Sequence, residues 1–339
     1  MTKDEVLARL DAPLESAALA AALEMGLFWQ LTTQPRSAKV IADGFGIPYA
    51  RCEAWLAVLV GAGFIEDSPQ GYVPAAATRE SILETWSRET WRMLAQEARE
   101  RLAAVRDLPS ALKAAPPVRP PRLDAYVVAM AEDPDRARRF TRMLSEVHRE
   151  LAERIAADLD LSSVRRLMDI GGGSGVVSMA LARRWPDLSI TILDIAPVCS
   201  AGKELVDKAK LGDRIFFRPA EFTRDALPTG FDAALECDVG TYTEELFGRV
   251  RAALKPGGLF AVIGEMADDA AAPTVETATR SMLRTLTDPG WQAPTLERTR
   301  GLLEQSGFVD VATRRLGSNA GVGGRASDPA LLLARVPAA

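Results

Sequence analysis

The stretch DIGGGSG, residues 169–175, constrains the fold of this chain more than any other. It places four glycines just after an acidic residue. The apolar run RRLMDI precedes it and the helix-like stretch VVSMALARRW follows it, so the glycines form a turn between a strand and a helix. Because glycine has no Cβ, such a turn can adopt positive φ and let a ligand lie against its backbone N–H groups. The sequence therefore predicts a nucleotide-type loop in an α/β domain.

Further apolar runs continue this pattern toward the C-terminus. They are RRLMDI, SITILDI, DRIFF, DAALEC and LFAVIGE, and helix-like stretches such as TEELFGRVRAALKPGG separate them. Strands that alternate with helices are typical of a doubly wound parallel sheet with helices on both faces. We therefore expect a Rossmann-like α/β domain over residues 163–339.

The N-terminal part of the chain has helical periodicity instead. Residues 14–28 read as a helix, and two short helices broken by Gly44 and Gly46 precede a strand-like wing around GYVP. Helix, turn, helix and wing form a winged-helix arrangement, whose alternative roles are DNA reading and dimerisation. The second of the short helices carries one basic residue, Arg51, where a phosphate-gripping face needs several. We expect residues 1–110 to be a winged-helix dimerisation domain of a homodimer.

Residues 111–162 connect the two domains. The stretch KAAPPVRPPRLD, residues 113–124, holds four prolines and predicts a surface connection. Apolar residues then line one face of residues 135–159, which predicts one long helix. We expect this connecting segment to roof a substrate pocket together with residues 282–291.

Charge, hydropathy and residue counts narrow the class of partner. A formal charge of -5 offers no general attraction for nucleic acid or anionic lipid. No apolar run is long enough for a membrane span, and the first residues do not resemble a signal peptide, so a cytoplasmic location is expected. The three cysteines have no paired spacing, and the single histidine, His148, excludes a multi-histidine metal site. A small-molecule partner is favoured, with no bound metal.

The spacing within the glycine loop separates two kinds of nucleotide cofactor. A dinucleotide fingerprint, G-x-G-x-x-G/A, would need glycine or alanine at Val176 or Ser178. The observed pattern is acid-x-G-x-G-x-G, with Asp169 ahead of three glycines. These glycines are Gly171, Gly173 and Gly175. The pattern therefore speaks against a dinucleotide.

Two further acids follow the next two predicted strands. Asp194, at the end of SITILD and next to Ile195, lies about twenty residues beyond the glycines, where an acid can accept hydrogen bonds from both ribose hydroxyls. Glu221 and Phe222 follow the third strand and could meet an adenine amine and ring face. This order suits S-adenosylmethionine, which has no pyrophosphate, with S-adenosylhomocysteine as its product.

Several stretches together resemble one family over nearly the whole chain. They are AALEMGLFWQL, CEAWLAVLVGAGFIED, LDAYVVAMAEDPDRARRFTRML, LMDIGGGSG, ILDI, LKPGGLFAVIGE and GLLEQSGFVDV. The chain resembles the bacterial and plant-type S-adenosylmethionine-dependent O-methyltransferases, in which a winged-helix dimerisation domain precedes a class I methyltransferase domain. By this resemblance residues 171–175 hold the methionine part of the cofactor, Asp194 the ribose, and Glu221 with Phe222 the adenine. The family normally has Asp where Glu221 stands, which keeps the charge and changes the reach.

The sequence departs from this family where the proton acceptor is expected. Members that methylate phenols follow the fourth strand with a lysine and then His-Asp-Trp, and the histidine removes the hydroxyl proton. Here Glu236 takes the place of the lysine, and Gly240, Thr241 and Tyr242 take the place of the triplet. No histidine follows His148, so no shift of the alignment restores the base. We assign Glu236 to the predicted cofactor contacts.

The absent histidine leaves the acceptor atom open. A phenol with a pKa near 10 benefits from a general base, whereas a thiol ionises more readily and a neutral amine already has its lone pair. O-methylation is favoured because it dominates the family, and N-, C- or S-methylation are alternatives. A second class consists of relatives that bind S-adenosylmethionine and catalyse hydroxylation, decarboxylation or ring rearrangement. A DNA-binding regulator that senses S-adenosylmethionine is a third.

Four residues are candidates to replace the missing base. Glu265 closes the fifth strand and coincides with a family position whose acid assists the base, so it is the first choice. Asp238 ends the fourth strand and could instead stabilise the sulfonium charge. Tyr242 could contact the substrate or simply pack, and His148 could contact the substrate or be a packing histidine.

A set of methionine and aromatic side chains is predicted to line the substrate pocket, which would suit a flat apolar molecule. The set comprises Tyr126, Met130, Met143, Met282, Leu286 and Trp291. Core packing is the alternative for each of them. The resemblance supports Met143 further, because the family places a methionine of that helix against the substrate.

Overall fold

A computed structural model describes residues 1–338 apart from 115–121, 269–271, 288–290 and 318–327. Backbone contacts divide the chain into two compact units, Met1–Ala114 and Ala115–Ala339. The division of the chain into three segments, with boundaries at residues 110 and 162, stays a prediction. Among the described residues, no helix combines the length and apolar character needed to cross a bilayer.

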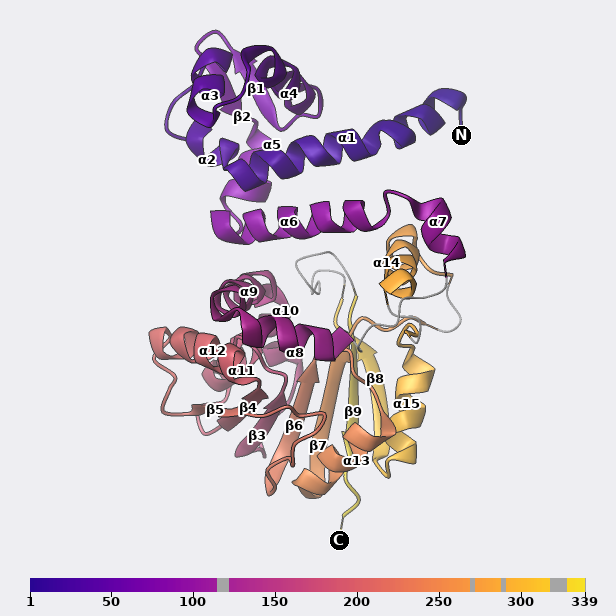
Figure 1. Cartoon of the computed structure of the whole chain (residues 1–339). Helices are drawn as coiled ribbons and strands as arrows, with labels where there is room; N and C mark the ends of the chain where they lie inside the picture. The colour runs from indigo at the N-terminus through magenta and orange to yellow at the C-terminus, as the bar shows by residue number, and fades with distance from the viewer. Residues whose placement is uncertain (115–121, 269–271, 288–290, 318–327, 339) are drawn as a thin grey trace. The chain divides into compact units, whose positions relative to one another are not determined.

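The first unit begins with a long helix and continues as helices around a small hairpin (Figure 1). Its elements are α1 (Lys3–Met25), α2 (Leu27–Leu31), α3 (Ala38–Phe45), α4 (Tyr49–Gly61), β1 (Ile65–Ser68), β2 (Gly71–Pro74), α5 (Ala76–Thr78), the π-helical turn η1 (Arg79–Leu83), α6 (Arg88–Ala104) and α7 (Leu108–Lys113). The strands β1 and β2 pair antiparallel. The elements α3, α4, β1 and β2 follow the order of helix, turn, helix and wing expected from the sequence.

The first helix starts earlier than its apolar pattern indicates. The Thr2 hydroxyl accepts from the backbone N–H of Glu5, and the Glu5 carboxylate accepts from the backbone N–H of Thr2. This reciprocal cap satisfies donors that the first turn would otherwise leave without partners. The expected start at residue 14 is therefore wrong, and the helix ends at Met25, followed by Gly26 as its C-cap with a φ of 77°.

The second unit is an α/β domain with one large sheet. Its elements are α8 (Arg122–Glu132), α9 (Pro134–Val147), α10 (Arg149–Asp158), β3 (Arg166–Ile170), α11 (Val176–Arg184), β4 (Ser189–Asp194), α12 (Ala196–Lys208), β5 (Ile215–Pro219), β6 (Phe231–Cys237), α13 (Glu244–Ala253), β7 (Leu254–Gly264), α14 (Val275–Thr287), α15 (Leu296–Gln305), β8 (Val309–Arg315) and β9 (Ala330–Arg335). The strand order is β5-β4-β3-β6-β7-β9-β8. The predicted doubly wound α/β class is confirmed.

The sheet is parallel except at one edge. The strands β3 to β7 pair in parallel, whereas β9 is antiparallel to both β7 and β8. The expectation of a wholly parallel sheet is therefore wrong at this edge. The sequence VDVATRR of β8 lacks an apolar run because it forms an exposed edge strand, where charged residues discourage pairing with another chain.

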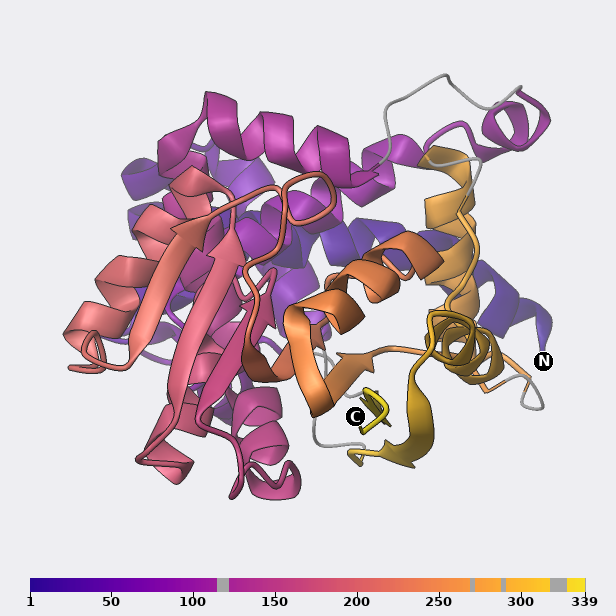
Figure 2. The same cartoon turned by 90° about the horizontal axis from the view of Figure 1, so that it is seen from below.

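Helices cover both faces of the sheet, as Figures 1 and 2 show. Neighbouring residues of β3 enter different cores: Leu167 packs with residues of α10 and α11, and Met168 packs with residues of α13 and α15. Successive strand residues point to opposite faces, so a sheet that is covered on both sides needs continuous apolar runs. This explains the uninterrupted runs such as DAALEC.

The predicted long helix over 135–159 is wrong, because the chain bends at His148. This residue has φ -99° and ψ 9°, and it ends α9 and begins α10. The helix α9 packs against α12, whereas α10 packs against α11. The segment changes direction because its two halves follow different helices of the sheet's outer layer, which the apolar periodicity alone does not indicate.

Candidate cofactor and proton-transfer site

The glycine loop lies between β3 and α11 and has the conformation that its sequence predicts. The φ angles of Gly171, Gly173 and Gly175 are 66°, 52° and 72°. A Cβ on Gly171 would lie 2.6 Å from Cγ2 of Val239 and 3.5 Å from Cε1 of Phe222. Glycine is therefore required at position 171 for two reasons, backbone conformation and the close approach of the segment after β6.

Asp169 lies at the end of β3 and contacts both the glycine loop and α11. Its carboxylate is buried and accepts a hydrogen bond of 2.6 Å from the Ser178 hydroxyl of α11. A Cβ on Gly172 would lie 2.5 Å from Oδ2 of the same carboxylate. Burial raises the pKa of Asp169 to about 6. These contacts indicate that Asp169 braces the loop against α11, whereas a direct contact with the cofactor stays a prediction.

Asp194 lies at the end of β4 beside the glycine loop. Its Oδ2 accepts from the backbone N–H of Gly173 at 3.0 Å, and its Oδ1 accepts from the backbone N–H of Ile195 at 2.8 Å. Burial raises the pKa of this carboxyl to about 6. Each carboxylate oxygen has a second lone pair, so the side chain can also accept from two vicinal hydroxyls. The residue fits the ribose role expected from the sequence.

Two residues of α8 lie near this nucleoside end. Burial, and next the charge of Asp194, raise the pKa of Tyr126, so this side chain lies within the field of that carboxylate. Met130 is buried and packs with Ile195 and Val198. These contacts fit the packing alternative for Met130, and its contact with a substrate stays a prediction. Tyr126 therefore lies near Asp194, and its contact with a substrate also stays a prediction.

The two residues expected to contact adenine, Glu221 and Phe222, differ in their exposure to solvent. The Glu221 carboxylate is partly exposed and forms an ion pair of 3.1 Å with Arg224. Phe222 is buried, and its ring edge reaches Gly171. The phenyl ring therefore contacts the glycine loop, and the Glu221 carboxylate lies nearer the surface.

Glu236 is fully buried near the end of β6, where it shapes the segment that follows. Its Oε1 accepts from the backbone N–H groups of Val239 and Gly240 at 3.1 and 3.3 Å. Among the described residues, its Oε2 has no hydrogen-bond partner. Burial and, next, the charge of Asp238 raise the pKa of Glu236 well above its ordinary value. The raised pKa favours the protonated form, and the two hydrogen bonds to Oε1 hold the chain after β6 in a turn.

His148 and Asp238, which were separate candidates in the sequence, lie together in the structure. The His148 Nε2 lies 3.8 Å from Oδ2 of Asp238, and the two side chains are 14% and 39% exposed. Asp238 has a φ of 56°, and its backbone N–H donates to the carbonyl of Ile263 in β7. Burial lowers the pKa of His148 to about 4, so its imidazole is neutral at pH 7. A neutral imidazole is able to accept a proton.

The other two candidate bases, Tyr242 and Glu265, have different surroundings. Burial and, next, the charge of Glu236 raise the pKa of Tyr242 well above its ordinary value, so its phenol stays protonated. The Glu265 carboxylate forms an ion pair with Arg280 of α14. One oxygen of this carboxylate therefore pairs with a cation, whereas its buried Oε1 has no hydrogen-bond partner among the described residues, and the role of Glu265 as the base stays a prediction.

The remaining residues expected to contact substrate lie on α9, on α14 and just after it. Met143 is buried on α9, Met282 and Leu286 are partly exposed on α14, and Trp291 is partly exposed. Their contact with a substrate stays a prediction.

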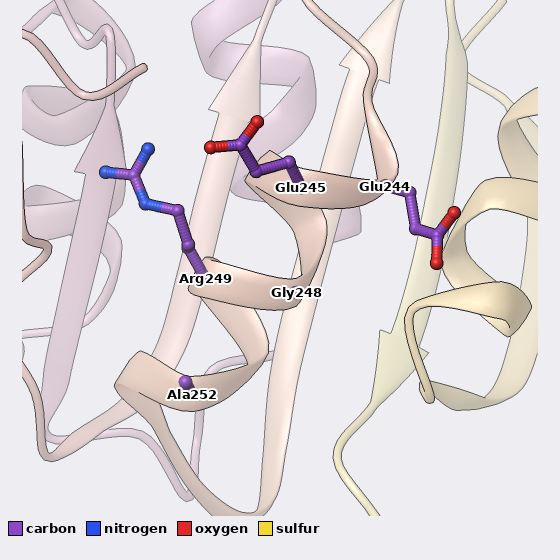
Figure 3. Close-up of a pocket in the computed structure, with 5 residues that line it drawn as sticks. All are labelled: Glu244, Glu245, Gly248, Arg249 and Ala252. Carbon is purple, nitrogen blue, oxygen red and sulfur yellow. The ribbon is translucent and has the colours of Figure 1, made fainter. Parts of the chain in front are cut away.

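A hollow on the surface of α13 offers no such chemistry. Figure 3 shows the residues that line it, which are Glu244, Glu245, Gly248, Arg249 and Ala252. All of them come from this one helix, and Arg249 donates to the backbone carbonyl of Asp225. The glycine loop and Asp194 do not take part in this hollow.

The fold and the loop define a class of protein. A sheet whose first strand ends in a positive-φ glycine loop, followed by a ribose acid at the end of the next strand, is the framework of a class I S-adenosylmethionine-binding domain. The O-methyltransferase domain family matches residues 124–309, more than half of the chain. The chain belongs to this family, it is a methyltransferase, and S-adenosylmethionine is its cofactor.

Individual relatives agree with this assignment. The chain is 28% identical over 270 residues to a 3-hydroxy-5-methyl-1-naphthoate 3-O-methyltransferase of Streptomyces sahachiroi. The matched region covers 78% of this chain and 77% of that protein. The chain is 26% identical to the N,N-dimethyltransferase OxyT of Streptomyces rimosus, covering 87% of each. The solved structure of PigF with SAH has a TM-score of 0.82 and 19% identity, covering 99% of this chain and 100% of that one, and it shows the same fold.

Proposed function

We propose that this protein transfers the methyl group of S-adenosylmethionine to a hydroxyl oxygen of a small aromatic metabolite. The observation that carries this proposal is the glycine loop with Asp194, because a bare backbone turn beside a buried ribose acid fits this nucleoside. The naphthoate O-methyltransferase relative supports an aromatic hydroxyl as the acceptor.

Bound S-adenosylmethionine supplies a methyl group that its sulfonium has already activated. The chain's own task is then to align the acceptor, exclude water and receive a proton. Three buried carboxyl groups, those of Asp169, Asp194 and Glu236, surround the ends of β3, β4 and β6. The ionised carboxylates of Asp169 and Asp194 favour a cationic ligand over a neutral one.

Methylation at nitrogen is the alternative that a comparison favours, because the relative OxyT is named as an N,N-dimethyltransferase. The same cofactor site therefore serves different acceptor atoms within related chains. A neutral amine needs no base, whereas a phenol does. The proposal of O-methylation consequently depends on a proton acceptor near the cofactor.

We also propose that the first unit is a winged-helix dimerisation unit and that the protein is a homodimer. Four large apolar side chains of α1 are exposed on turns that follow one another. They are Val6, Leu7, Leu10 and Leu14, which are 44%, 50%, 70% and 72% exposed. Apolar residues at this spacing form one stripe on a helix, and such exposed stripes mark contact surfaces. The cytoplasmic location stays a prediction.

The test combines calorimetry and an assay of methyl transfer. Calorimetry with S-adenosylhomocysteine checks the cofactor site, and incubation with S-adenosylmethionine and a panel of a hydroxynaphthoate, a thiophenol and an aniline checks the acceptor. We expect S-adenosylhomocysteine and a methyl ether to accumulate with the phenol. Methylation of the aniline alone would replace O-methylation by N-methylation, and conversion of an acceptor without release of S-adenosylhomocysteine would indicate a different reaction.

A further inference from the structure

We propose that His148 and Asp238 together form the proton-accepting pair of the methyl transfer, with the imidazole taking the proton and the carboxylate stabilising the imidazolium. This inference rests on the proposed O-methylation. It places the base at the bend between α9 and α10, whereas members of the family with the usual histidine have it after the fourth strand of the sheet.

The first argument is the position of the pair at the cofactor loop. Asp238 follows β6 directly, and its neighbour Val239 packs against Gly171 of the glycine loop. His148 lies 3.8 Å from the Asp238 carboxylate, measured from Nε2 to Oδ2. The pair therefore lies at the carboxyl ends of the parallel strands, where ligands of open α/β sheets bind.

The second argument is that the fold holds Asp238 in an uncommon conformation. Its φ of 56° lies in the left-handed region, which non-glycine residues rarely adopt and which costs about 1 kcal/mol or more. Glu236 holds this turn by accepting the next two backbone N–H groups, those of Val239 and Gly240. The backbone N–H of Asp238 is fixed to Ile263. The structure thus maintains a strained residue beside the single histidine.

The third argument is the protonation state of the two groups. The imidazole is neutral at pH 7 because burial lowers its pKa to about 4. Proton transfer to it creates a cation 3.8 Å from the partly exposed carboxylate of Asp238. An opposite charge at this distance favours the protonated imidazole. The Asp238 carboxylate can therefore stabilise the imidazolium, whose formation burial by itself disfavours.

The atoms and charges of the step balance as follows. The acceptor oxygen forms a bond to the methyl carbon while the bond from that carbon to sulfur breaks, and the electron pair of the broken bond stays on sulfur. The hydroxyl proton passes to the imidazole of His148. The products are a methyl ether, neutral S-adenosylhomocysteine and an imidazolium, which returns its proton to solvent before the next turnover.

The single histidine makes the pair measurable without a known substrate. In protein carrying a tag without histidine, the imidazole ¹⁵N and ¹H resonances belong to His148 alone. We expect Asp238→Asn to shift these resonances at pH 7, whereas Asp213→Asn, a change at an exposed acid before β5, leaves them in place. Identical spectra for wild type and Asp238→Asn would overturn the pairing.

The same resonances test the distance to the reacting centre. S-adenosylmethionine and S-adenosylhomocysteine differ by one methyl group and one positive charge at sulfur. We expect the His148 resonances to differ between the two complexes, because a charge close to the imidazole perturbs it. Equal resonances in both complexes would place His148 away from the methyl group and overturn the proposal.

Kinetics then separate the base from the cofactor site. His148→Asn should lower kcat for the phenol by about a hundredfold, within the range for loss of a general base, and affect a thiophenol far less. Its affinity for S-adenosylhomocysteine should equal that of wild type. Full activity of this variant with the phenol would refute the role of His148.

Absence of S-adenosylhomocysteine binding to the wild type would instead refute the proposed function, while the Asp238→Asn spectra would still decide the pairing.

Discussion

At the scale of single residues, the buried acids near the ends of the central strands decide the chemistry of the site. Asp169 and Asp194 are buried with pKa values raised to about 6, and Glu236 has its pKa raised further. At each of these positions, one or both carboxyl oxygens accept hydrogen bonds from neighbouring groups. Burial alone would disfavour charge at all three positions, and a cationic ligand would offset that cost.

The raised pKa of Asp194 makes cofactor affinity depend on pH. With a pKa of about 6, its carboxyl is mostly protonated at pH 5 and mostly ionised at pH 7. A protonated carboxyl accepts fewer hydrogen bonds, so we expect S-adenosylhomocysteine to bind about tenfold more weakly at pH 5 than at pH 7. Calorimetry at both values measures this difference.

Asp194→Asn is the matched variant. It should lose about 1–3 kcal/mol of binding free energy at pH 7 and should remove most of the dependence on pH. Equal affinities of wild type and variant at pH 7 would contradict the ribose assignment.

The raised pKa of Glu236 makes folding stability depend on pH in a defined direction. The folded protein keeps a proton that the unfolded chain releases above a pH of about 4.3, so this group's contribution falls as pH rises, by up to about 1.4 kcal/mol per unit. Glu236→Gln removes that contribution. We expect wild type to lose more unfolding free energy between pH 5 and pH 8 than the variant does in urea titrations. Asp213→Asn serves as the control and should keep the wild-type slope.

At the scale of elements, the segments after β3 and β6 form the site together. The glycine loop follows β3, and residues 238–240 follow β6, its neighbour in the sheet. Val239 packs so closely on Gly171 that no side chain fits between them. The two connections therefore fix each other, and the position of Asp238 depends on the glycine loop as well as on its own strand.

A comparison of Gly171 and Gly257 distinguishes the cost of a left-handed backbone from the cost of a steric clash at the Cβ position. Gly171 and Gly257 have φ angles of 66° and 75°, but only Gly171 has a neighbour in the space of a Cβ. Alanine at either position should cost about 1–2 kcal/mol of stability through its left-handed backbone. Gly171→Ala should in addition weaken binding of S-adenosylhomocysteine at least about tenfold, which is about 1.4 kcal/mol.

The control for this prediction is Gly257→Ala, which should bind the nucleoside as wild type does. Adding Val239→Ala to Gly171→Ala should restore part of the affinity, because it removes the atom that the new Cβ meets. Binding by Gly171→Ala equal to that of wild type would show that the loop tolerates the clash. Calorimetry measures all these variants.

At the scale of the whole molecule, our proposals assign separate tasks to the two units. The residues assigned to the cofactor and to proton transfer all belong to the second unit, which spans Ala115–Ala339. The exposed apolar stripe of α1 belongs to the first unit. Association and cofactor binding should therefore be separable by mutation.

Glutamate at positions 10 and 14 tests this separation. The double change Leu10→Glu and Leu14→Glu places two charges in the exposed stripe, so we expect a monomer in sedimentation-velocity experiments where wild type is a dimer. The affinity for S-adenosylhomocysteine should stay at the wild-type value. Glutamate at Ala12 and Ser16, two exposed positions with the same spacing on the opposite face of α1, provides the matched control and should leave the dimer intact. A monomeric wild type would contradict the proposed homodimer.

Features of the sequence that act over a few residues were sufficient to predict the fold class and the cofactor. The strand, glycine turn and helix around 169–175 follow from apolar periodicity and from the freedom of glycine at positive φ, and both act within a few residues. Asp194 could be placed because the carboxyl ends of parallel strands meet at one edge. Ser178 and Val239 were missed because an ordinary helix residue and an ordinary apolar residue carry no signal of their contacts with the loop.

Only the tertiary structure decided which candidate side chains meet. Sequence reasoning did not indicate that Glu265 forms an ion pair with Arg280 of α14, and it did not join His148 to Asp238. Both outcomes depend on how helices far away in the sequence pack against the sheet, including the bend that divides α9 from α10. Periodicity records which face of an element is buried; the partner against which that face packs is set by the fold as a whole.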